Sequence, residues 1–280
     1  MAKKMLKMRY NGELFEQYYY PQLYRLPGEP EPRRGKREKE TTAAKEKINR
    51  RERKVAFMRT AQANFVAGRD LAVALHFSQP VTIKQARRCL NKFHSLRRKR
   101  HAAEWKAVPS AEKKRRHNRG EDATYRAMMC AEDHSEEGQP INLHFHLLMS
   151  RNPDRKRQAL AGIREDWARA CGDFAGSAKV ETLEGSDCFM QLAAYYLKMR
   201  REKGVKAWTS TRSCKAAPPP VYQRIPDRDV PDLPPGCMWI DGHDDFNPLI
   251  GAWGYRICRV TDQRKFRRWW NKLNRNIHKD

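Results

Sequence analysis

The chain has 280 residues, 39% of them hydrophobic, which is enough to bury one substantial core, alone or with a small appended module, and excludes a disordered tail. Its 58 lysines and arginines outnumber 33 acidic residues and give a formal charge of +25, so nucleic acid is the first partner to consider. The seven cysteines are scattered, which indicates reduced thiols in the cytoplasm and argues against disulfides and a cysteine zinc site. No apolar run approaches the ~20 residues that span a bilayer, and the start of the chain has no continuous apolar segment, so we expect neither a membrane partner nor a secretory signal.

The first 66 residues combine an aromatic start with a dense run of charges. Residues 1 to about 30 mix tyrosines with prolines, as in YYYPQLYRLPGEPEP, and we expect an extended arm there. The next stretch, RRGKREKETTAAKEKINRRERKVAFM, has a helical pattern. That helix is either a solvated surface helix or a helix that contacts DNA. We therefore assign residues 1–66 to a basic N-terminal arm and helix.

A strand followed by an amphipathic helix begins at Asp70. The run LAVALHFS is typical of a buried strand, and Pro80 closes it. Thr82 and Gln85 fit a capping box at the start of a helix. The apolar positions that follow at helical spacing are Ala86, Cys89, Leu90, Phe93 and Leu96 or Arg97.

Two basic clusters follow this helix, RRKRHAAEWK and EKKRRHNRG, and they flank the segment between them. Lysine and arginine side chains supply most of the affinity of a protein for a phosphate backbone. We expect the following residues of these clusters to contact DNA: Arg97, Arg98, Lys99, Arg100, Lys113, Lys114, Arg115 and Arg116.

An antiparallel hairpin with two histidines is predicted next. YRAMMCAEDH and INLHFHLLMS both have the pattern of strands, and EEGQP between them has that of a turn. Side chains alternate across a sheet, so His144 and His146 share one face, with Cα atoms roughly 7 Å apart. Two such imidazoles either pack on a half-buried face or converge on one metal ion.

A third metal ligand is available at the end of the preceding strand. A hairpin can bring the carboxylate of Glu132 beside the two imidazoles. Two nitrogens and one oxygen with open positions suit Mn²⁺ or Mg²⁺ that polarises a phosphate. The competitors for this third place are Asp133, His134, Glu136 and Glu137.

The pattern continues with a helix over residues 155–172, a short strand AKVETL, and a long helix in SDCFMQLAAYYLKMRREKG. Ser186 or Asp187 fits the N-cap of this last helix, and Gly204 lies beyond its end. Its polar stripe consists of Gln191, Tyr195, Lys198 and Glu202, and its apolar stripe of Phe189, Leu192, Tyr196 and Met199. Tyr195 therefore faces away from the buried side, either as a solvent-facing side chain or as a nucleophile near a metal-bound phosphate.

Residues 213–280 are expected to form a proline-rich linker and a basic C-terminal helix. The prolines lie in residues 218–235, and RKFRRWWNKLNRNIHK has an aromatic face that we expect to dock on the core. Between them, the acidic patch DGHDDF, from Asp241 to Phe246, is either a second hard-metal site or, as we favour, a surface turn.

Three of these segments, taken in order, resemble the motifs of the His-hydrophobe-His (HUH) replication initiators. LAVALHFS is similar to their first strand motif, LHFHLLM to their metal-binding strand, and AAYYLK to their helix with Tyr-x-x-Lys. KAWTSTRS is also similar to a segment of some phage and plasmid initiators. The resemblance covers roughly residues 68–205. The sequence has no tyrosine four residues after Tyr195, so it does not support the variant of the mechanism that uses two tyrosines.

The resemblance implies an α+β fold, with a ferredoxin-like or RRM-like core at 67–212 whose central antiparallel sheet carries the HUH strand, between basic helical extensions. It implies that Mn²⁺ or Mg²⁺ is held by His144, His146 and, as the third ligand, Glu132. It also implies that Tyr195 is the nucleophile and that Lys198 assists at the phosphate, although the adjacent Tyr196 is a second hydroxyl in the motif.

The function implied is the nicking of single-stranded or hairpin origin DNA at the start of rolling-circle replication, through a 5′-phosphotyrosine. A host helicase and polymerase are then expected as partners, because the chain lacks a G-x-x-x-x-G-K-[ST] loop of its own. A relaxase or a single-strand transposase uses the same chemistry. The alternative from another class is a basic nucleic-acid-binding protein without catalytic activity.

Overall fold

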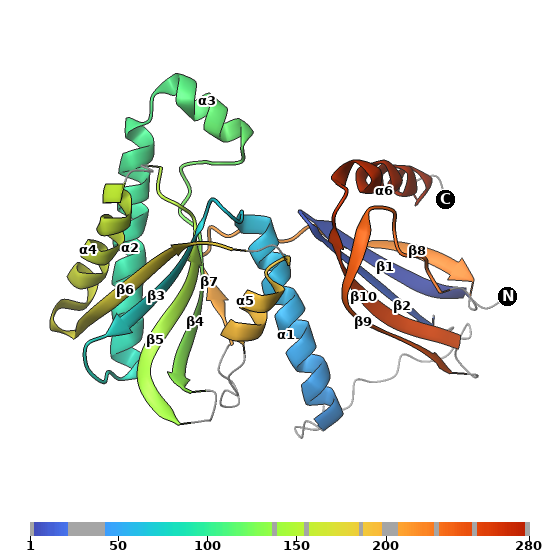
Figure 1. Cartoon of the computed structure of the whole chain (residues 1–280), viewed down its shortest axis with the longest axis horizontal. Coiled ribbons are helices and arrows are strands. Elements are labelled where there is room, and N and C mark those ends of the chain that lie inside the picture. Colours follow the sequence, from blue (N-terminus) through green and yellow to red (C-terminus); the bar gives the residue numbers. More distant parts are fainter. Residues whose placement is uncertain are drawn as a thin grey trace, which may run out of the picture. The chain divides into compact units, whose positions relative to one another are not determined.

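The computed structural model describes residues 3–21, 43–135, 139–153, 157–184, 187–197, 207–226, 230–247 and 251–277. The chain divides into two compact units (Figure 1). Unit 1 combines Met1–Gln62 with Ala216–Asp280, and unit 2 is the continuous segment Ala63–Lys215. Each unit contains a five-stranded sheet whose neighbouring strands are antiparallel, and the described residues form six α-helices, so the expected α+β class is confirmed.

The sheet of unit 2 has the strand order β6-β3-β5-β4-β7. The predicted first strand and the predicted hairpin are both confirmed. In β3, alternate side chains from Leu71 to Phe77 are buried, as expected for a strand with one face on a core. The strands are β3 (Leu71–Phe77), β4 (Ala127–His134), β5 (Pro140–Met149), β6 (Ala175–Thr182) and β7 (Thr209–Ser210).

Two helices, α2 (Ile83–Ala107) and α4 (Arg157–Cys171), pack together against one face of this sheet (Figure 1). The capping box of Thr82 and Gln85 is confirmed at the start of α2. Between the helices and the sheet lies a core that includes Phe93, Trp167 and Phe145. A further helix, α3 (Ser110–Asn118), has no buried residue, and its Glu112 and Arg116 form an ion pair one turn apart. None of the helices in the described part of the chain combines the length and apolarity that crossing a membrane requires.

The expected DNA contact by Arg97 is wrong. Its side chain is fully buried, and its Nη1 donates to Asp166 Oδ2 at 2.8 Å. A second hydrogen bond joins Arg97 to the side-chain oxygen of Asn152. The reason is its position on α2, where residue 97 continues the inward stripe of Ala86, Cys89, Leu90 and Phe93.

Replacing Arg97 by alanine is expected to lower the free energy of unfolding by roughly 2–3 kcal/mol, because Asp166 and Asn152 each lose a buried hydrogen-bond partner while Arg100 still pairs with Asp166. Urea unfolding of the two proteins measures this difference. The matched control is Arg98→Ala, whose side chain is exposed on the same helix and should change stability by less than about 0.5 kcal/mol. Equal losses in the two variants would contradict a structural role for the buried pair.

A buried histidine in unit 2 predicts a loss of stability in acid. His94 is almost completely buried, its Nδ1 lies 2.9 Å from the Tyr125 hydroxyl, and burial, followed by the charge of Arg98, lowers the pKa of His94 to about 4. The unfolded chain takes up this proton near pH 6.5 and the folded chain only near 4. The free energy of unfolding should therefore fall by up to roughly 3 kcal/mol as the pH drops through this window.

The measurement is urea unfolding at about pH 7.5 and about pH 5, for the protein and for His94→Gln. The variant lacks the imidazole, so its unfolding free energy should depend less on pH. Identical pH dependence in both proteins would assign the effect to other groups.

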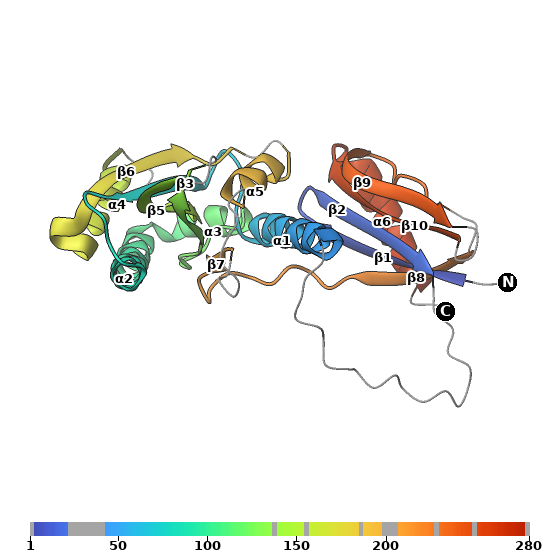
Figure 2. The same cartoon turned by 90° about the horizontal axis from the view of Figure 1, so that it is seen from below.

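The sheet of unit 1 has the strand order β8-β1-β2-β10-β9 and joins the two ends of the chain. The helix α6 (Gln263–Ile277) packs on one of its faces through Phe266 and two tryptophans (Figure 2). The aromatic face therefore docks as expected, but on the sheet formed by the terminal segments rather than on the core expected at residues 67–212. The strands are β1 (Lys3–Asn11), β2 (Leu14–Pro21), β8 (Val221–Pro226), β9 (Cys237–Asn247) and β10 (Gly251–Val260).

Two expectations for these segments are wrong. Residues 3–21 are a hairpin rather than an extended arm, and Gly12 at its turn has a φ of +62° that favours glycine. The acidic patch DGHDDF lies within β9 rather than in a surface turn, and its Asp244 forms an ion pair of 2.6 Å with Arg256 on β10. Both segments form strands because each pairs with the neighbouring strand of a hairpin, β1 with β2 and β9 with β10.

The basic helix expected near the N-terminus is confirmed as α1 (Ala43–Asn64). Some of the arginines of α1 contact residues of the sheet of unit 1. Arg59 makes a two-pronged ion pair with Glu16 at 2.6 and 2.8 Å, and the guanidinium of Arg51 lies 4.0 Å from the ring centroid of Tyr255. These contacts place α1 against the sheet face opposite α6.

Candidate metal centre

The hairpin of β4 and β5 brings three polar side chains to one place. The register pairs Glu132 with His144 and Cys130 with His146. Leu143, Phe145 and Leu147 belong to the core under α2 and α4, so the histidines between them project from the other face of the sheet. The sequence pattern thus forms the expected cluster.

The side chains of Glu132, His144 and His146 are close enough to share one ion. His146 Nε2 lies 2.7 Å from Glu132 Oε2, and His144 Nε2 lies 3.3 Å from the same oxygen. The two Nε2 atoms are 3.2 Å apart. All three residues are buried, and one ligand atom from each lies within 4.8 Å of the others. Within the described residues, this is the group that can hold a metal ion.

Hydrogen bonding and burial prepare the histidines as ligands. His144 Nδ1 lies 3.1 Å from the backbone carbonyl of Asn142, which fixes the tautomer with Nδ1–H and leaves the Nε2 lone pair directed at the cluster. Burial lowers the pKa of His146, and the Glu132 carboxylate opposes this shift. A neutral imidazole is the form that binds metal.

The competing ligands are not part of the cluster. Asp133 and His134 are exposed and pair with each other at 2.9 Å. Glu136 and Glu137 lie outside the described residues. Glu132 is therefore the carboxylate that the hairpin register places beside the histidines.

A third histidine next to the cluster was missed by the sequence analysis. His76 on β3 is paired with His144, and the two rings stack with centroids 4.8 Å apart. Burial and the neighbouring His144 lower the pKa of His76. The signal was present, because His76 alternates with the buried Leu75 and Phe77 and so occupies the same sheet face as the histidines of β5.

The helix with the two tyrosines is shorter than expected. It is α5 (Met190–Tyr196), which begins after two buried residues with positive φ, Cys188 at 58° and Phe189 at 65°. The Asp187 carboxylate accepts a hydrogen bond from the Gln191 amide at 2.7 Å, so Asp187 stabilises the first turn without being the residue next to the helix. Ser186, Lys198, Met199, Glu202 and Gly204 lie outside the described residues.

Both tyrosines of α5 lie against the metal cluster. The ring of Tyr195 meets the ring of His146 edge-on at 5.3 Å, and the ring of Tyr196 stacks on it at 5.0 Å. Tyr195 is 46% exposed, whereas Tyr196 is 7% exposed, and burial raises the pKa of Tyr196. The expected division of α5 into a polar and an apolar stripe is confirmed for these two residues. Tyr195 is therefore the hydroxyl that a substrate can reach.

The remaining basic candidates differ in how free their charges are. Arg98, Lys99, Lys114 and Arg115 are exposed, and Arg115 Nη1 lies 4.0 Å from Glu112 Oε2. Arg100 pairs with Asp166 and Glu165, and Arg116 pairs with Glu112 and donates to the Pro153 carbonyl. Lys113 donates to the Lys106 carbonyl. The exposed residues are thus the better candidates for phosphate contacts.

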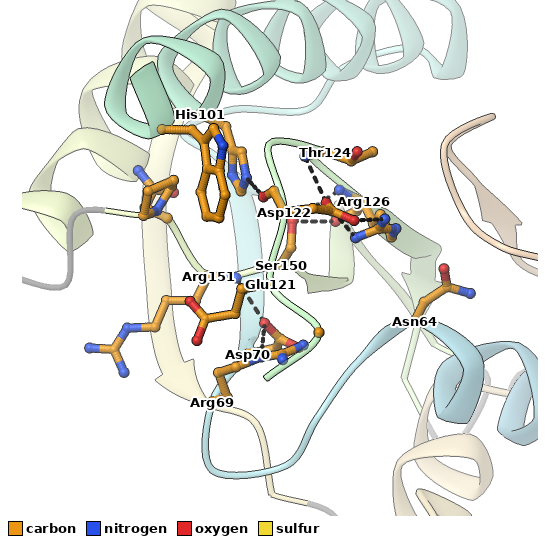
Figure 3. Close-up of a pocket in the computed structure, with 14 residues that line it drawn as sticks. Asn64, Arg69, Asp70, His101, Glu121, Asp122, Thr124, Arg126, Ser150 and Arg151 are labelled. Atoms are coloured by element: carbon orange, nitrogen blue, oxygen red, sulfur yellow. Dashed lines mark hydrogen bonds and ion pairs between the residues drawn. The ribbon is translucent and has the colours of Figure 1, made fainter. Parts of the chain in front are cut away.

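A polar hollow lies at the opposite end of the same strands (Figure 3). It is lined by residues from the start of β3, the segment before β4 and the end of β5. Its charges are largely paired within it: Arg126 donates twice to Asp122, and Asp70 accepts from the backbone of Arg151. It shares no residue with the metal cluster.

No protein-family model, curated protein or solved structure matches this chain. Function has to be inferred from the geometry of the site. That geometry combines a buried pair of imidazoles, a carboxylate and an exposed phenol. Such a set can hold a divalent cation beside a nucleophile, which is the arrangement needed to attack a phosphodiester.

Proposed function

We propose that this chain is a metal-dependent tyrosine endonuclease of the HUH superfamily, which nicks single-stranded or hairpin origin DNA to start rolling-circle replication. The observation that carries the proposal is the exposed Tyr195 against the buried group of Glu132, His144 and His146. Residues on β4, β5 and α5 converge there, and β5 and α5 carry the second and third of the motifs. The formal charge of +25 supports a nucleic-acid substrate.

The topology of unit 2 supports the fold that this superfamily would require. Strands β3, β4, β5 and β6 have the spatial order β6-β3-β5-β4, and helices α2 and α4 follow β3 and β5. This is a β-α-β-β-α-β succession, apart from the extra helix α3. We therefore assign unit 2 to a ferredoxin-like or RRM-like core.

In the proposed reaction, Glu132, His144 and His146 would hold Mn²⁺ or Mg²⁺, which supplies positive charge to a non-bridging phosphate oxygen. The Tyr195 oxygen attacks phosphorus as its proton leaves. The bond from phosphorus to the 3′ oxygen breaks, and this oxygen takes up a proton. The products are a 5′-phosphotyrosine and a free 3′ hydroxyl, with Lys198 proposed to assist at the phosphate.

The stored phosphotyrosine bond allows later rejoining without a nucleotide cofactor. The free 3′ end can prime synthesis by a host polymerase, and a host helicase would open the duplex. A relaxase or a transposase would form the same intermediate. A hairpin origin in the DNA that flanks the gene is the feature that distinguishes the replication initiator.

The test is incubation of the full chain with single-stranded oligonucleotides that span the flanking DNA, in Mn²⁺, followed by a denaturing gel. A protein band whose shift survives denaturation is expected, together with a DNA fragment that has a free 3′ end. Binding without any covalent adduct on these oligonucleotides would favour the non-catalytic nucleic-acid-binding protein.

A further inference from the structure

The sheet of unit 1 has a second face, opposite α6. The helix α1 covers part of this face through Arg59 and Arg51, and the exposed part carries aromatic and basic side chains. Leu6, Met8 and Phe15 point to α6 and form its core. Side chains alternate along a strand, so the residues between them project from the other face. On β8 the alternation is visible as exposure, with Ile225 turned to the core and Tyr222 and Arg224 exposed.

One row of these side chains crosses all five strands, and Arg51 of α1 lies over its Tyr255. The register pairs Tyr222 with Lys7, Lys7 with Tyr18, Tyr18 with Tyr255, and Tyr255 with His243. Neighbouring strands lie ~4.8 Å apart, so four steps span roughly 19 Å. Three of the five side chains are tyrosines and one is a lysine.

A neighbouring row continues the pattern. Arg224 is paired with Met5, Met5 with Tyr20, and Trp253 lies two residues from Tyr255 on β10. Tyr222 is 48% exposed, Tyr20 is 42% exposed and Trp253 is 36% exposed. Exposed aromatic rings that gather on one face of a sheet are typical of an interaction surface, whereas single exposed rings are not.

The charges on this face favour an anionic partner. Lys7 Nζ lies 5.5 Å from the ring centroid of Tyr18, and Arg51 lies over Tyr255. Glu16 on β2 is held in the two-pronged ion pair with Arg59. On β9, Asp245 is paired with Trp253 in the register and lies 3.8 Å from the His243 ring. Lys7 and Arg224 lie on β1 and β8, at the other edge of the sheet from this carboxylate, so the positive charge is concentrated on that side.

We propose that this face, defined by Tyr222, Lys7, Tyr20, Arg224 and Trp253, binds single-stranded DNA. Unpaired bases stack on exposed aromatic rings of a sheet, while interleaved lysine and arginine side chains follow the phosphates. The bases of a duplex already stack on one another, so the rings select single strands. The site lies in unit 1, and the inference does not rest on the proposed cleavage chemistry of unit 2.

The test measures the affinity of the full chain for a labelled oligothymidylate of about 20 nucleotides. The double variant Tyr20→Ala/Tyr222→Ala should bind at least about tenfold more weakly, because stacking on each ring is lost. Tyr20→Phe/Tyr222→Phe should bind like the unmodified protein, because the rings remain. The matched control is Trp239→Ala, which removes a 45% exposed aromatic ring from the other face of the sheet and should leave affinity unchanged.

A second variant needs no change at an aromatic residue. Arg224→Gln, at an exposed position, should reduce the slope of log affinity against log salt by about 0.7, the value for one phosphate contact on a single strand.

Equal affinity of the double alanine variant and the unmodified protein would overturn the inference. Tighter binding of duplex DNA, or of RNA of the same length, would overturn the choice of partner.

The proposed nickase activity and the proposed single-strand site can be contradicted independently of each other. His144→Ala/His146→Ala should keep the binding of oligothymidylate that depends on the tyrosines of unit 1. Intact binding of this kind without any covalent adduct would contradict the nickase alone. Adduct formation without any effect of the tyrosines of unit 1 would contradict the single-strand site alone.

Discussion

Tyr195→Phe is expected to eliminate the covalent DNA adduct completely while the protein stays folded. The substitution removes only the hydroxyl of a side chain that is 46% exposed, so packing on α5 is unchanged. The ring would still meet the ring of His146. Without that oxygen no phosphotyrosine can form, and adduct yield on a denaturing gel should fall to background.

Tyr196→Phe provides the matched control on the adjacent residue. Its ring is buried and stacks on His146, so the phenylalanine keeps that contact, and at most ~1 kcal/mol of stability is lost with the hydroxyl. Adduct yield should remain close to that of the unmodified protein. Peptide mapping of the trapped adduct decides between the two, and a nucleotide found on Tyr196 would refute the assignment of the nucleophile.

Removal of either imidazole of the metal cluster is expected to abolish cleavage and the binding of Mn²⁺. His144 and His146 each supply an Nε2 within 3.3 Å of the same Glu132 oxygen, so either loss leaves only two ligands. Glu132→Gln should weaken the binding of Mn²⁺, because it removes the one anionic ligand of the cluster. Titration calorimetry with Mn²⁺ measures this effect independently of activity, and EDTA should inhibit the unmodified protein.

The affinity of these variants for single-stranded DNA should change little, because phosphate contacts by lysine and arginine supply most of it. His134→Ala is the matched control, since His134 is exposed on the same hairpin and pairs with Asp133 outside the cluster. It should retain both Mn²⁺ binding and cleavage. Full cleavage by His144→Ala/His146→Ala in EDTA would remove the metal from the mechanism.

The elements of unit 2 could be predicted because their signals are local. The alternation in β3, the capping box at Thr82 and the spacing of His144 and His146 all lie within a few residues. The register that brings Glu132 beside them follows from a single hairpin. The metal cluster was therefore predictable from short segments of sequence.

The remaining features depend on partners that are distant in the sequence. Arg97 has the appearance of a surface residue in a basic run, and its burial depends on Asp166, which is 69 residues away on α4. The strand β1 is paired at one edge with β8, with Lys3 opposite Pro226. No window of neighbouring residues contains either relation.

The division of the chain also sets an order of events during synthesis. Unit 2 is continuous, so all of it is synthesised before β8, β9 and β10 of unit 1. The strand β2 needs β10 on its open edge, with Tyr19 opposite Gly254, and a lone two-stranded hairpin is marginally stable. At roughly 5–20 residues per second, β1 and β2 wait for tens of seconds with unpaired backbone groups. The nascent N-terminus is thus the part of this protein that a chaperone has most reason to shield, and a truncation before β10 would leave that edge open to aggregation.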